Sequence, residues 1–456
     1  MAAPLAAMLP YAATLFSSLF LFSGRYPRWQ AAFLGKQIDR AAHSSTYRVV
    51  INTRLSAERK GRSRPMKLVI VSMTFDPSSL ASAYRALKLA KYLARAGCEL
   101  ELVSADSPDI HVTEINGNLL RIPYRPPLRG SSLAARLISR LLVLPEPQRA
   151  WVKPAVRGAL ARLRADLPDA VIVTSPPHSI QLVGVALAQE LHVPYFADLR
   201  DDWITNEQLR WHTPLHRFAA RMCEKTVVSF ASGVFLPTEI IRSRFVERYP
   251  QWSHRIYTLT NGYDEDDFNA IDFDPARGLP DEKMILMYSG GDYGGFITSR
   301  LSILAKRMKE IGLQRAWHIV TAGPADWPPA QYRDVWTHLG LLSHQLSAQA
   351  LLKANVLLLA FPLGVGAVSL KIYSYLRSGL PIVYIGECGA ATDLLGRFDG
   401  TFVLERHWWP KLADWLDENG PIFLSNYPRP GIEEYSFHSL TGKLLEIIKW
   451  TRSAES

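Results

Sequence analysis

The sequence contains little cysteine. The 456 residues include three cysteines, Cys98, Cys223 and Cys388, which lie far apart and are odd in number. Neither a CxxC spacing nor a cluster of cysteine and histidine accompanies them, so the sequence supports neither a disulfide framework nor a zinc site. This cysteine usage favours a reducing compartment.

Internal repeats and nucleic-acid recognition motifs are also missing. No segment recurs at the periods of solenoid proteins, and the net charge of +10 is not accompanied by a motif that reads bases. We therefore expect no nucleic-acid partner. A hydrophobic content of 48% and a charged content of 21% are typical of a folded globular protein. A chain of this length predicts two domains with extensions.

The N-terminal segment has two interpretations. Residues 2–23 carry no charge and approach the length of a membrane span, but prolines interrupt them and no basic segment precedes them. Residues 38–65 form a polar, basic linker. Met66 then opens a strand that is typical of the start of an α/β domain. Residues 1–65 are therefore either a membrane anchor with its linker or a stretch upstream of the true start.

Residues 121–164 are strongly basic. They contain ten cations and one acid, Glu146. Leu133, Leu137 and Leu141 recur at helical spacing within this stretch, beside arginines. Basic residues next to an apolar helix face suit an anionic membrane surface. An ordinary helix with a buried apolar face and solvated arginines explains the pattern equally well.

From Met66 onward, apolar runs rich in β-branched residues alternate with helical patterns. The first series has predicted strands at 67–72, 99–103, 170–174 and 193–197, with helices at 82–96 and 179–191. The second has strands at 284–288, 318–322, 355–360 and 382–385, with a helix at 298–310. A polar, acidic loop at 261–268 separates the two series, and an amphipathic helix at 436–450 ends the chain. This order predicts an α/β protein with parallel sheets that are covered on both faces.

Two segments after predicted strands suit an anion. Lys371 stands in the first turn of a short helix that ends at residues 379–381, and free backbone N–H groups with a nearby lysine favour a diphosphate. The loop 289–295 follows the strand 284–288. Its glycines, Gly290 and Gly291, would let the backbone approach a phosphate, or would simply allow a tight turn. The spacing of the glycines differs from that of a dinucleotide-binding fingerprint.

The segment 198–203 follows another strand and combines acids with a cation. Asp201 or Asp202 would orient or deprotonate a hydroxyl group, with Asp198 beside them, and Arg200 would bind a phosphate. Trp203 offers a flat ring for a sugar or for packing. The alternative to a functional cluster is a structural knot of ion pairs.

His178 and Glu239 are further candidates near strand ends. His178 would be a general base or would bind an acceptor, with Ser179 capping the next helix, although a lone histidine is more often structural. Glu239 would touch a ligand, but a capping role for Thr238 explains that stretch as well.

Together these residues resemble the family 4 glycosyltransferases of the GT-B fold, of the type found in bacterial polysaccharide and cell-wall synthesis. The matching elements occur in the family's order at residues 66–72, 174–177, 198–203, 261–264, 288–290 and 371–381. The resemblance implies two Rossmann-like parallel-sheet domains facing across a cleft. The acceptor-side domain would span residues 66–268 and the donor-binding domain residues 269–430. Residues 431–456 would form a helix crossing back to the first domain.

The resemblance also implies an activity. Such an enzyme transfers a sugar, with retention of configuration, from a nucleotide diphosphate donor to a lipid-linked or polysaccharide acceptor. It needs neither a cofactor nor a catalytic metal. The expected place is the cytoplasm, peripheral to the inner membrane, with an anionic membrane surface as a partner.

The resemblance assigns site residues by position. Lys371 would contact the donor diphosphate, and Gly290 and Gly291 would line the phosphate loop. Arg200 and Trp203 would face the acceptor. The candidate catalytic residues are Asp201, Asp198 and His178.

The sequence departs from the family pattern at its acids. Ser374 stands where the family usually has the second of two paired glutamates, and the loop 362–369 lacks the first. Arg300 is the nearest match to the arginine that often follows the phosphate loop. Loss of one charged hydrogen bond, of about 1.5–3 kcal/mol, weakens donor binding by roughly one to two orders of magnitude. A catalytically silent nucleotide-sugar-binding or scaffold subunit is therefore the alternative, and a nucleotide-sugar epimerase of the same fold is a third reading.

Overall fold

The computed structural model describes residues 64–76, 81–106, 117–125, 143–205, 211, 213–270, 279–280, 282–325, 327–362 and 364–455. The segment predicted for residues 1–65 therefore lies outside the described residues, apart from its last two. The leucine-rich part of the basic stretch, residues 126–142, lies outside them as well. In the described part of the chain, no helix combines the length and the apolar character that a membrane span requires.

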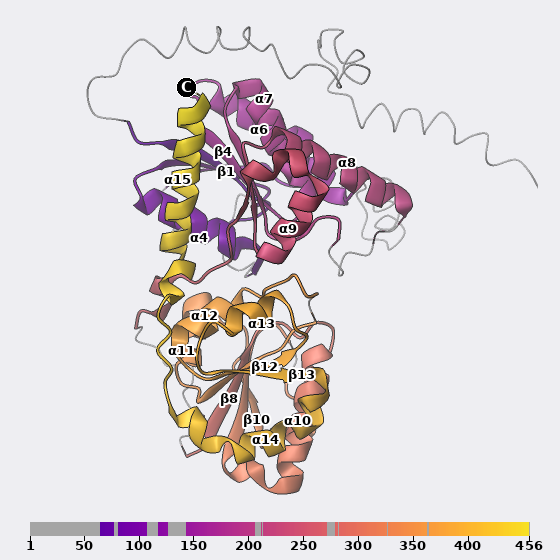
Figure 1. The fold of residues 1–456 in the computed structure, drawn as a ribbon, viewed down its shortest axis with the longest axis vertical. Coiled ribbons are helices and arrows are strands. Elements are labelled where there is room, and N and C mark those ends of the chain that lie inside the picture. Colours follow the sequence, from indigo (N-terminus) through magenta and orange to yellow (C-terminus); the bar gives the residue numbers. More distant parts are fainter. Residues whose placement is uncertain are drawn as a thin grey trace, which may run out of the picture. The chain divides into compact units, whose positions relative to one another are not determined.

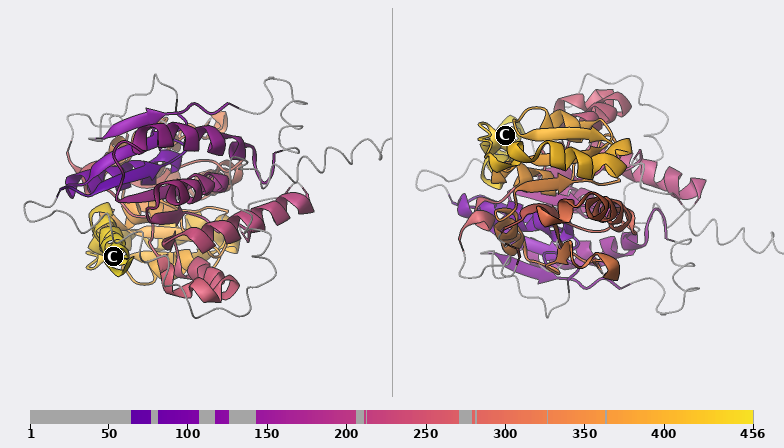
Figure 2. Two further views of the ribbon diagram at one scale, coloured as in Figure 1. Left: turned by 90° about the horizontal axis from the view of Figure 1, so that it is seen from above. Right: turned by 90° about the horizontal axis from the view of Figure 1, so that it is seen from below.

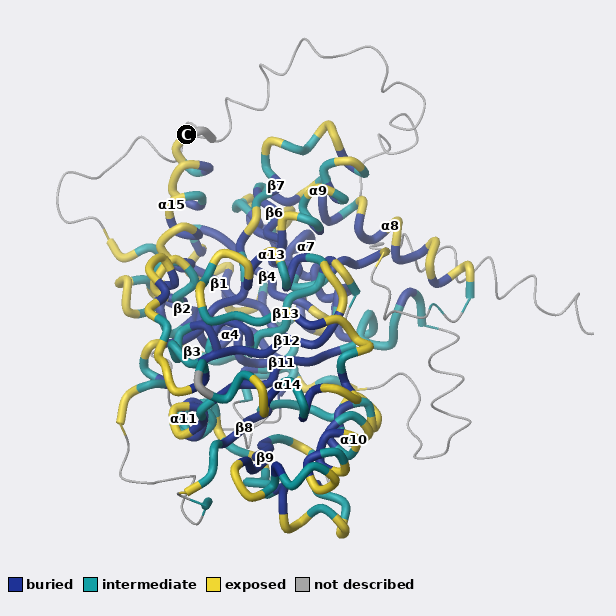
Figure 3. Tube along the Cα trace, turned by 60° about the horizontal axis from the view of Figure 1, so that its bottom comes forward, coloured by how far each residue is buried: buried dark blue, intermediate teal, exposed yellow. Residues whose placement is uncertain are grey.

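The first structural element is a seven-stranded sheet in the order β3-β2-β1-β4-β5-β6-β7, with every neighbouring pair parallel (Figure 1). Its strands are β1 Lys67–Val71, β2 Glu99–Ser104, β3 Asn118–Arg121, β4 Ala170–Ser175, β5 Tyr195–Leu199, β6 Gly233–Leu236 and β7 Ile256–Thr258. The central strands are buried throughout, because both faces of the sheet are covered (Figure 3).

Successive side chains along the strands point to opposite faces of this sheet, so the core around it consists of two layers. Val69 and Val71 face one side, where α6 Val152–Leu163, α7 Gln181–Leu191, α8 Pro214–Phe230 and α9 Glu239–Arg248 pack. Leu68 and Ile70 face the other side, where α4 Ala81–Arg95 and the C-terminal helix α15 Phe437–Glu455 pack. The outer end of α8 extends away from the sheet in both views of Figure 2.

The second element is a six-stranded parallel sheet in the order β10-β9-β8-β11-β12-β13. Its strands are β8 Met284–Ser289, β9 Trp317–Ala322, β10 Trp336–His338, β11 Val356–Leu359, β12 Ile382–Gly386 and β13 Thr401–Glu405. On one face lie α10 Phe296–Ile311 and α14 Leu412–Glu418. On the other lie α11 His344–Leu351, α12 Lys371–Ser378 and α13 Ala390–Leu395.

The predicted fold class, α/β with two Rossmann-like parallel sheets, is confirmed. The predicted strands and helices are present with shifts of a few residues at their ends. The sequence pattern does not predict β3, β6, β7, β10 and β13, because these strands are three to five residues long and carry too few side chains to show a period. Thr238 caps α9 by accepting a hydrogen bond from the Ile241 amide at 3.3 Å. The expected cap at Ser179 is wrong, because that residue lies inside a short 3-10 helix, His178–Ile180.

Candidate functional site

A pocket of about 630 Å³ lies where β8 and β9 end and α12 begins. This is the edge at which open parallel sheets bind ligands. The pocket brings together Lys371, Gly290, Gly291 and Ser374, four of the five residues predicted to hold a donor. The remaining described lining residues are Tyr84, Asp267, Ser289, Tyr293, Ala322, Gly323, Pro324, Leu341, Leu342, His344, Ser347, Ala348, Leu351, Ser369, Leu370 and Tyr375.

Lys371 is the cation of this pocket. Its Nζ is buried, lies 3.9 Å from the centre of the Tyr288 ring, and forms no hydrogen bond with any described residue. Burial lowers the pKa of Lys371 from 10.5 to about 7, because an ammonium loses its hydration there and gains no carboxylate in return. An anion that entered the pocket would supply the missing partner.

The glycine loop leaves room for that ammonium. Gly290 has a φ of +144°, and a Cβ built on it would lie 2.2 Å from the Lys371 Nζ. Its amide donates to the Ala322 carbonyl at 2.8 Å, so Gly290 contributes its small size and not a free N–H group. A Cβ on Gly291 would meet nothing within 4 Å. Both interpretations of the loop therefore apply. Gly290 needs a positive φ, as a tight turn would, and the loop also borders the pocket.

Helix α12 holds the glycine loop in place. The Tyr375 hydroxyl accepts a hydrogen bond from the Ser289 amide at 2.8 Å. The Tyr288 hydroxyl donates to the Gly291 carbonyl at 2.7 Å. The helix ends at Gly379, whose φ of +75° suits a residue without Cβ. The segment 371–381 thus supplies the lysine and also one of the contacts that fix the loop opposite to it.

Arg300, the fifth residue predicted on the donor side, lies apart from the other four. Its guanidinium lies 4.6 Å from the centre of the Phe296 ring and donates to the Ser299 hydroxyl at 2.9 Å. It does not belong to the described lining of the pocket. Asp267 is the one carboxylate among the described lining residues, and it accepts hydrogen bonds from Tyr84 at 2.9 Å and Lys88 at 3.0 Å.

The apolar wall of the pocket is not predicted by the sequence. Leu341 and Leu342 line it beside Leu351, and the His344 ring lies 4.1 Å from the Tyr84 ring, centre to centre. Leu341 is 58% exposed, so part of this apolar wall is open to solvent. Nothing in the sequence separates such a leucine from a buried one.

Asp198 belongs to a buried ion pair. Its carboxylate accepts hydrogen bonds from the Arg85 Nη2 at 2.7 Å, from the Arg85 Nε at 2.8 Å and from the Thr174 hydroxyl at 2.7 Å. Asp198 is 1% exposed. A carboxylate with these partners positions β4, β5 and α4 relative to one another, as the structural alternative described.

The rest of the predicted cluster lies at the ends of β4 and β5. His178 stacks on Trp203 with ring centres 5.2 Å apart, and both are buried, so Trp203 is used in packing. Burial lowers the pKa of His178 to about 3 and keeps its ring neutral. Arg200 donates to the Ser175 carbonyl at 3.0 Å, and burial raises the pKa of the adjacent Asp201. None of these residues lines the 630 Å³ pocket.

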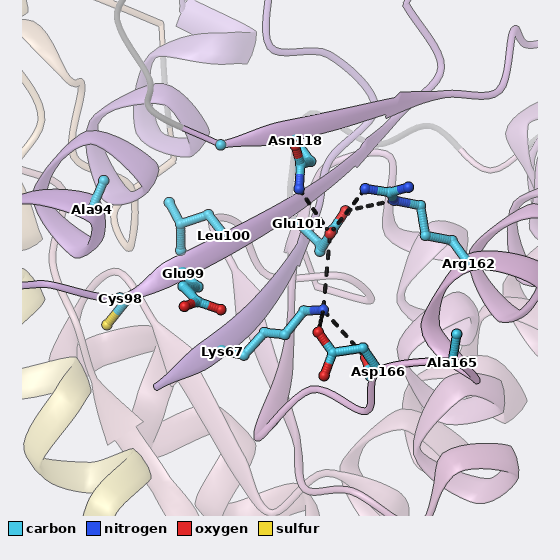
Figure 4. Close-up of a pocket in the computed structure, with 11 residues that line it drawn as sticks. Lys67, Ala94, Cys98, Glu99, Leu100, Glu101, Asn118, Arg162, Ala165 and Asp166 are labelled. Atoms are coloured by element: carbon cyan, nitrogen blue, oxygen red, sulfur yellow. Dashed lines mark hydrogen bonds and ion pairs between the residues drawn. The ribbon is translucent and has the colours of Figure 1, made fainter. Parts of the chain in front are cut away.

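A second cavity, of about 710 Å³, lies at the amino ends of β1, β2 and β3 (Figure 4). Four of its five charged side chains pair with one another. Lys67 lies 2.6 Å from Asp166, and Arg162 lies 3.1 Å from Glu101. In the described part of the chain, no group of three or more His, Cys, Asp or Glu side chains is placed to hold a metal ion.

Comparison with known proteins shows what this chain is similar to. Residues 81–262 match the family model of the glycosyl transferase 4-like domain. The chain carries a glycosyl transferase 4-like domain. The match spans α4 to the end of the seven-stranded sheet, whereas the glycine loop and Lys371 lie at the six-stranded sheet. A search of curated proteins by sequence finds no match to this chain.

Solved structures share the fold of this chain. A sucrose-phosphate synthase from Thermosynechococcus elongatus is 14% identical with a TM-score of 0.60, covering 85% of this chain and all of its own. HepE from Anabaena, solved with UDP and glucose, is 15% identical with a TM-score of 0.55, covering 84% and 99%. A putative UDP-N-acetylglucosamine 2-epimerase from Listeria monocytogenes is 14% identical with a TM-score of 0.55, covering 86% and 98%. At these identities the likeness shows the fold alone.

Proposed function

We propose that the 630 Å³ pocket binds the nucleoside diphosphate of a sugar donor, and that the enzyme transfers this sugar with retention to a lipid-linked or polysaccharide acceptor. The observation that carries the proposal is Lys371, a buried ammonium without a hydrogen-bond partner among the described residues. It lies beside a glycine that leaves it room, in a pocket at the carboxyl ends of two parallel strands. A diphosphate is the anion that a lysine at such an edge suits.

The pocket residues have distinct tasks in this proposal. Cleavage of the donor places negative charge on the departing diphosphate, and Lys371, whose Nζ is buried, stabilises that charge. Ser374 takes the place of an acid near the donor and offers a hydroxyl to it. The apolar wall around Leu341 and Leu342 suits the flat faces of a nucleobase. UDP is the first nucleotide to test, because HepE was solved with UDP and glucose.

The acceptor and the cellular place belong to the same proposal. Retention, the lack of a catalytic metal, the cytoplasmic place at the inner membrane and a role in surface glycan synthesis rest on the likeness to family 4. A lipid-linked acceptor is supported by the basic character of the acceptor-side domain, where Lys153 and Arg157 are exposed on α6. We take Asp201 as the acid to test on that side, because Asp198 is committed to Arg85.

The experiment follows nucleotide binding and nucleotide release separately. Titration calorimetry with UDP, GDP and TDP measures binding, and we expect Lys371→Ala to weaken it roughly 10- to 100-fold, since one charged hydrogen bond is lost. Lys306→Ala is the matched control, because Lys306 is 71% exposed on α10, outside the pocket lining. Release of the diphosphate from nucleotide-sugars is then followed with and without a membrane lipid extract.

The outcomes separate the readings. Release that depends on the extract and is lost in Lys371→Ala supports the transfer. Binding without release in any arm contradicts it and favours a silent subunit. Conversion of the donor to its epimer contradicts both.

A further inference from the structure

Helix α8 carries an apolar surface that faces solvent. Leu215, Phe218 and Met222 are spaced by three and four residues, so they lie on one side of the helix. They are 52%, 56% and 41% exposed. Exposed and buried residues alternate along this helix in Figure 3. Three large apolar side chains on one exposed helix face form a patch that needs a partner.

The charges beside this patch have one sign. Arg217, Arg221 and Lys225 are exposed on α8 and form no ion pair with a described residue. The one acid of the helix, Glu224, is 0% exposed and accepts a hydrogen bond from the Tyr249 hydroxyl at 2.8 Å. The outer face of α8 therefore presents cations and apolar side chains without a carboxylate.

The helix is held firmly by its other face. His216, Ala220, Cys223 and Val227 are buried against the seven-stranded unit. Thr213 caps the first turn and Pro214 follows it, an order that favours the start of a helix. The patch is thus presented on a fixed element and does not need to fold when it meets a partner.

We infer that the outer face of α8, defined by Leu215, Phe218, Met222, Arg217, Arg221 and Lys225, docks on an anionic lipid surface. Apolar side chains enter the boundary between headgroups and acyl chains, while the neighbouring cations meet the lipid phosphates. A second copy of this chain is disfavoured, since two α8 faces that both carry exposed cations would repel each other. The inference rests on the proposed function only in placing the enzyme at a membrane.

The test reads the position of α8 directly, because other parts of the full-length chain also contain basic and apolar segments. An environment-sensitive fluorophore is attached at Met222→Cys, with Cys98 and Cys388 replaced by serine and the buried Cys223 retained. The matched control carries the fluorophore at Lys306→Cys on α10. Vesicles contain either phosphatidylcholine alone or equal parts of phosphatidylcholine and phosphatidylglycerol. We expect a blue shift at position 222 with the anionic vesicles and none at position 306.

Two variants of the unlabelled protein separate charge from apolar contact. Because each cation near the surface strengthens binding by roughly fivefold, Arg217→Gln with Arg221→Gln and Lys225→Gln should weaken binding to anionic vesicles on the order of 100-fold. Leu215→Ser with Phe218→Ser should weaken it as well. Retained UDP binding and an unchanged Tm show that both variants are folded. If the parent protein itself does not bind UDP, that result contradicts the function proposed for the pocket and leaves the inference on α8 unaffected.

Three results would overturn the inference. The first is an unshifted fluorophore at position 222 while the protein floats with the vesicles, because another segment then binds the lipid. The second is a concentration-dependent shift without vesicles, which identifies a second copy as the occupant. The third is equal binding to neutral and anionic vesicles.

Discussion

At the scale of single residues, the burial of Lys371 predicts that the proposed nucleotide binding depends on pH. In the free protein its pKa is about 7, because burial disfavours the ammonium. A bound diphosphate favours the charged form, so binding above this pH must be accompanied by uptake of a proton. We expect the affinity for a nucleoside diphosphate to fall by up to about tenfold per unit between about pH 7 and pH 9. Calorimetry across this range measures the slope.

The same residue predicts the pH dependence of stability without ligand. Since the folded pKa lies below the unfolded value of 10.5, the unfolded chain binds more protons between about pH 7 and that value. The free energy of unfolding should therefore rise with pH over this window in the wild type, and Lys371→Met should remove this contribution. The same substitution should flatten the binding slope. An unchanged slope in the variant would show that another group titrates.

A third residue-scale prediction compares two neighbouring glycines. Gly290→Ala places a Cβ 2.2 Å from the Lys371 Nζ and strains a φ of +144°, so we expect nucleotide affinity to fall at least tenfold. Gly291→Ala, in the same loop, meets open space and should retain most of the affinity. Equal affinities in the two variants would show that the loop does not contact the diphosphate.

At the scale of elements, the C-terminal helix α15 stabilises the first sheet. Leu440, Leu444 and Ile448 recur at helical spacing and are buried in the same cluster as α4. We expect Leu444→Ala to lower the free energy of unfolding by about 2–4 kcal/mol, because it leaves a cavity. Trp450→Ala on the same helix, at a residue 62% exposed, should change it by less than about 0.5–1 kcal/mol. Urea unfolding measures both, and similar losses would mean that α15 is not docked as described.

At the scale of the whole molecule, α4 binds the acidic segment that joins the two sheets. Lys88 lies 2.7 Å from Asp264 and 3.0 Å from Asp267, and Lys91 adds a second pair to Asp264. Lys88→Met would leave buried carboxylates without their main partner and should cost about 3–5 kcal/mol of stability. Lys443→Met, at an exposed lysine of α15, is the control. Equal Tm values for the two variants would contradict this role.

The same junction predicts sensitivity to acid. Burial by itself would raise the pKa of Asp264, but Lys88, Lys91 and Tyr92 outweigh burial and lower it to about 2. This carboxylate therefore stabilises the protein above its ordinary pKa of 3.8, and its contribution is lost as the pH falls toward 2. Lys88→Met should weaken this part of the acid transition.

Part of the fold and four of the residues that line the 630 Å³ pocket could be predicted from the sequence. The central buried strands show as apolar runs, and α4, α7, α10, α12 and α15 show as periodic patterns. Because the carboxyl ends of parallel strands meet at one edge, Lys371 and Gly290 could be expected near each other although eighty residues of chain lie between them.

The tertiary structure alone decided what surrounds each candidate. Arg85 lies far from Asp198 in sequence, and only the packing of α4 on the sheet pairs the two and commits the carboxylate to a structural role. Arg300 lies against Phe296 and Ser299 of its own helix and is not among the described residues that line the pocket. Likewise, the exposed leucines of the pocket wall and of α8 differ from core leucines only in what packs against them. A sequence encodes the pattern along each element, whereas burial and pairing depend on contacts between distant elements.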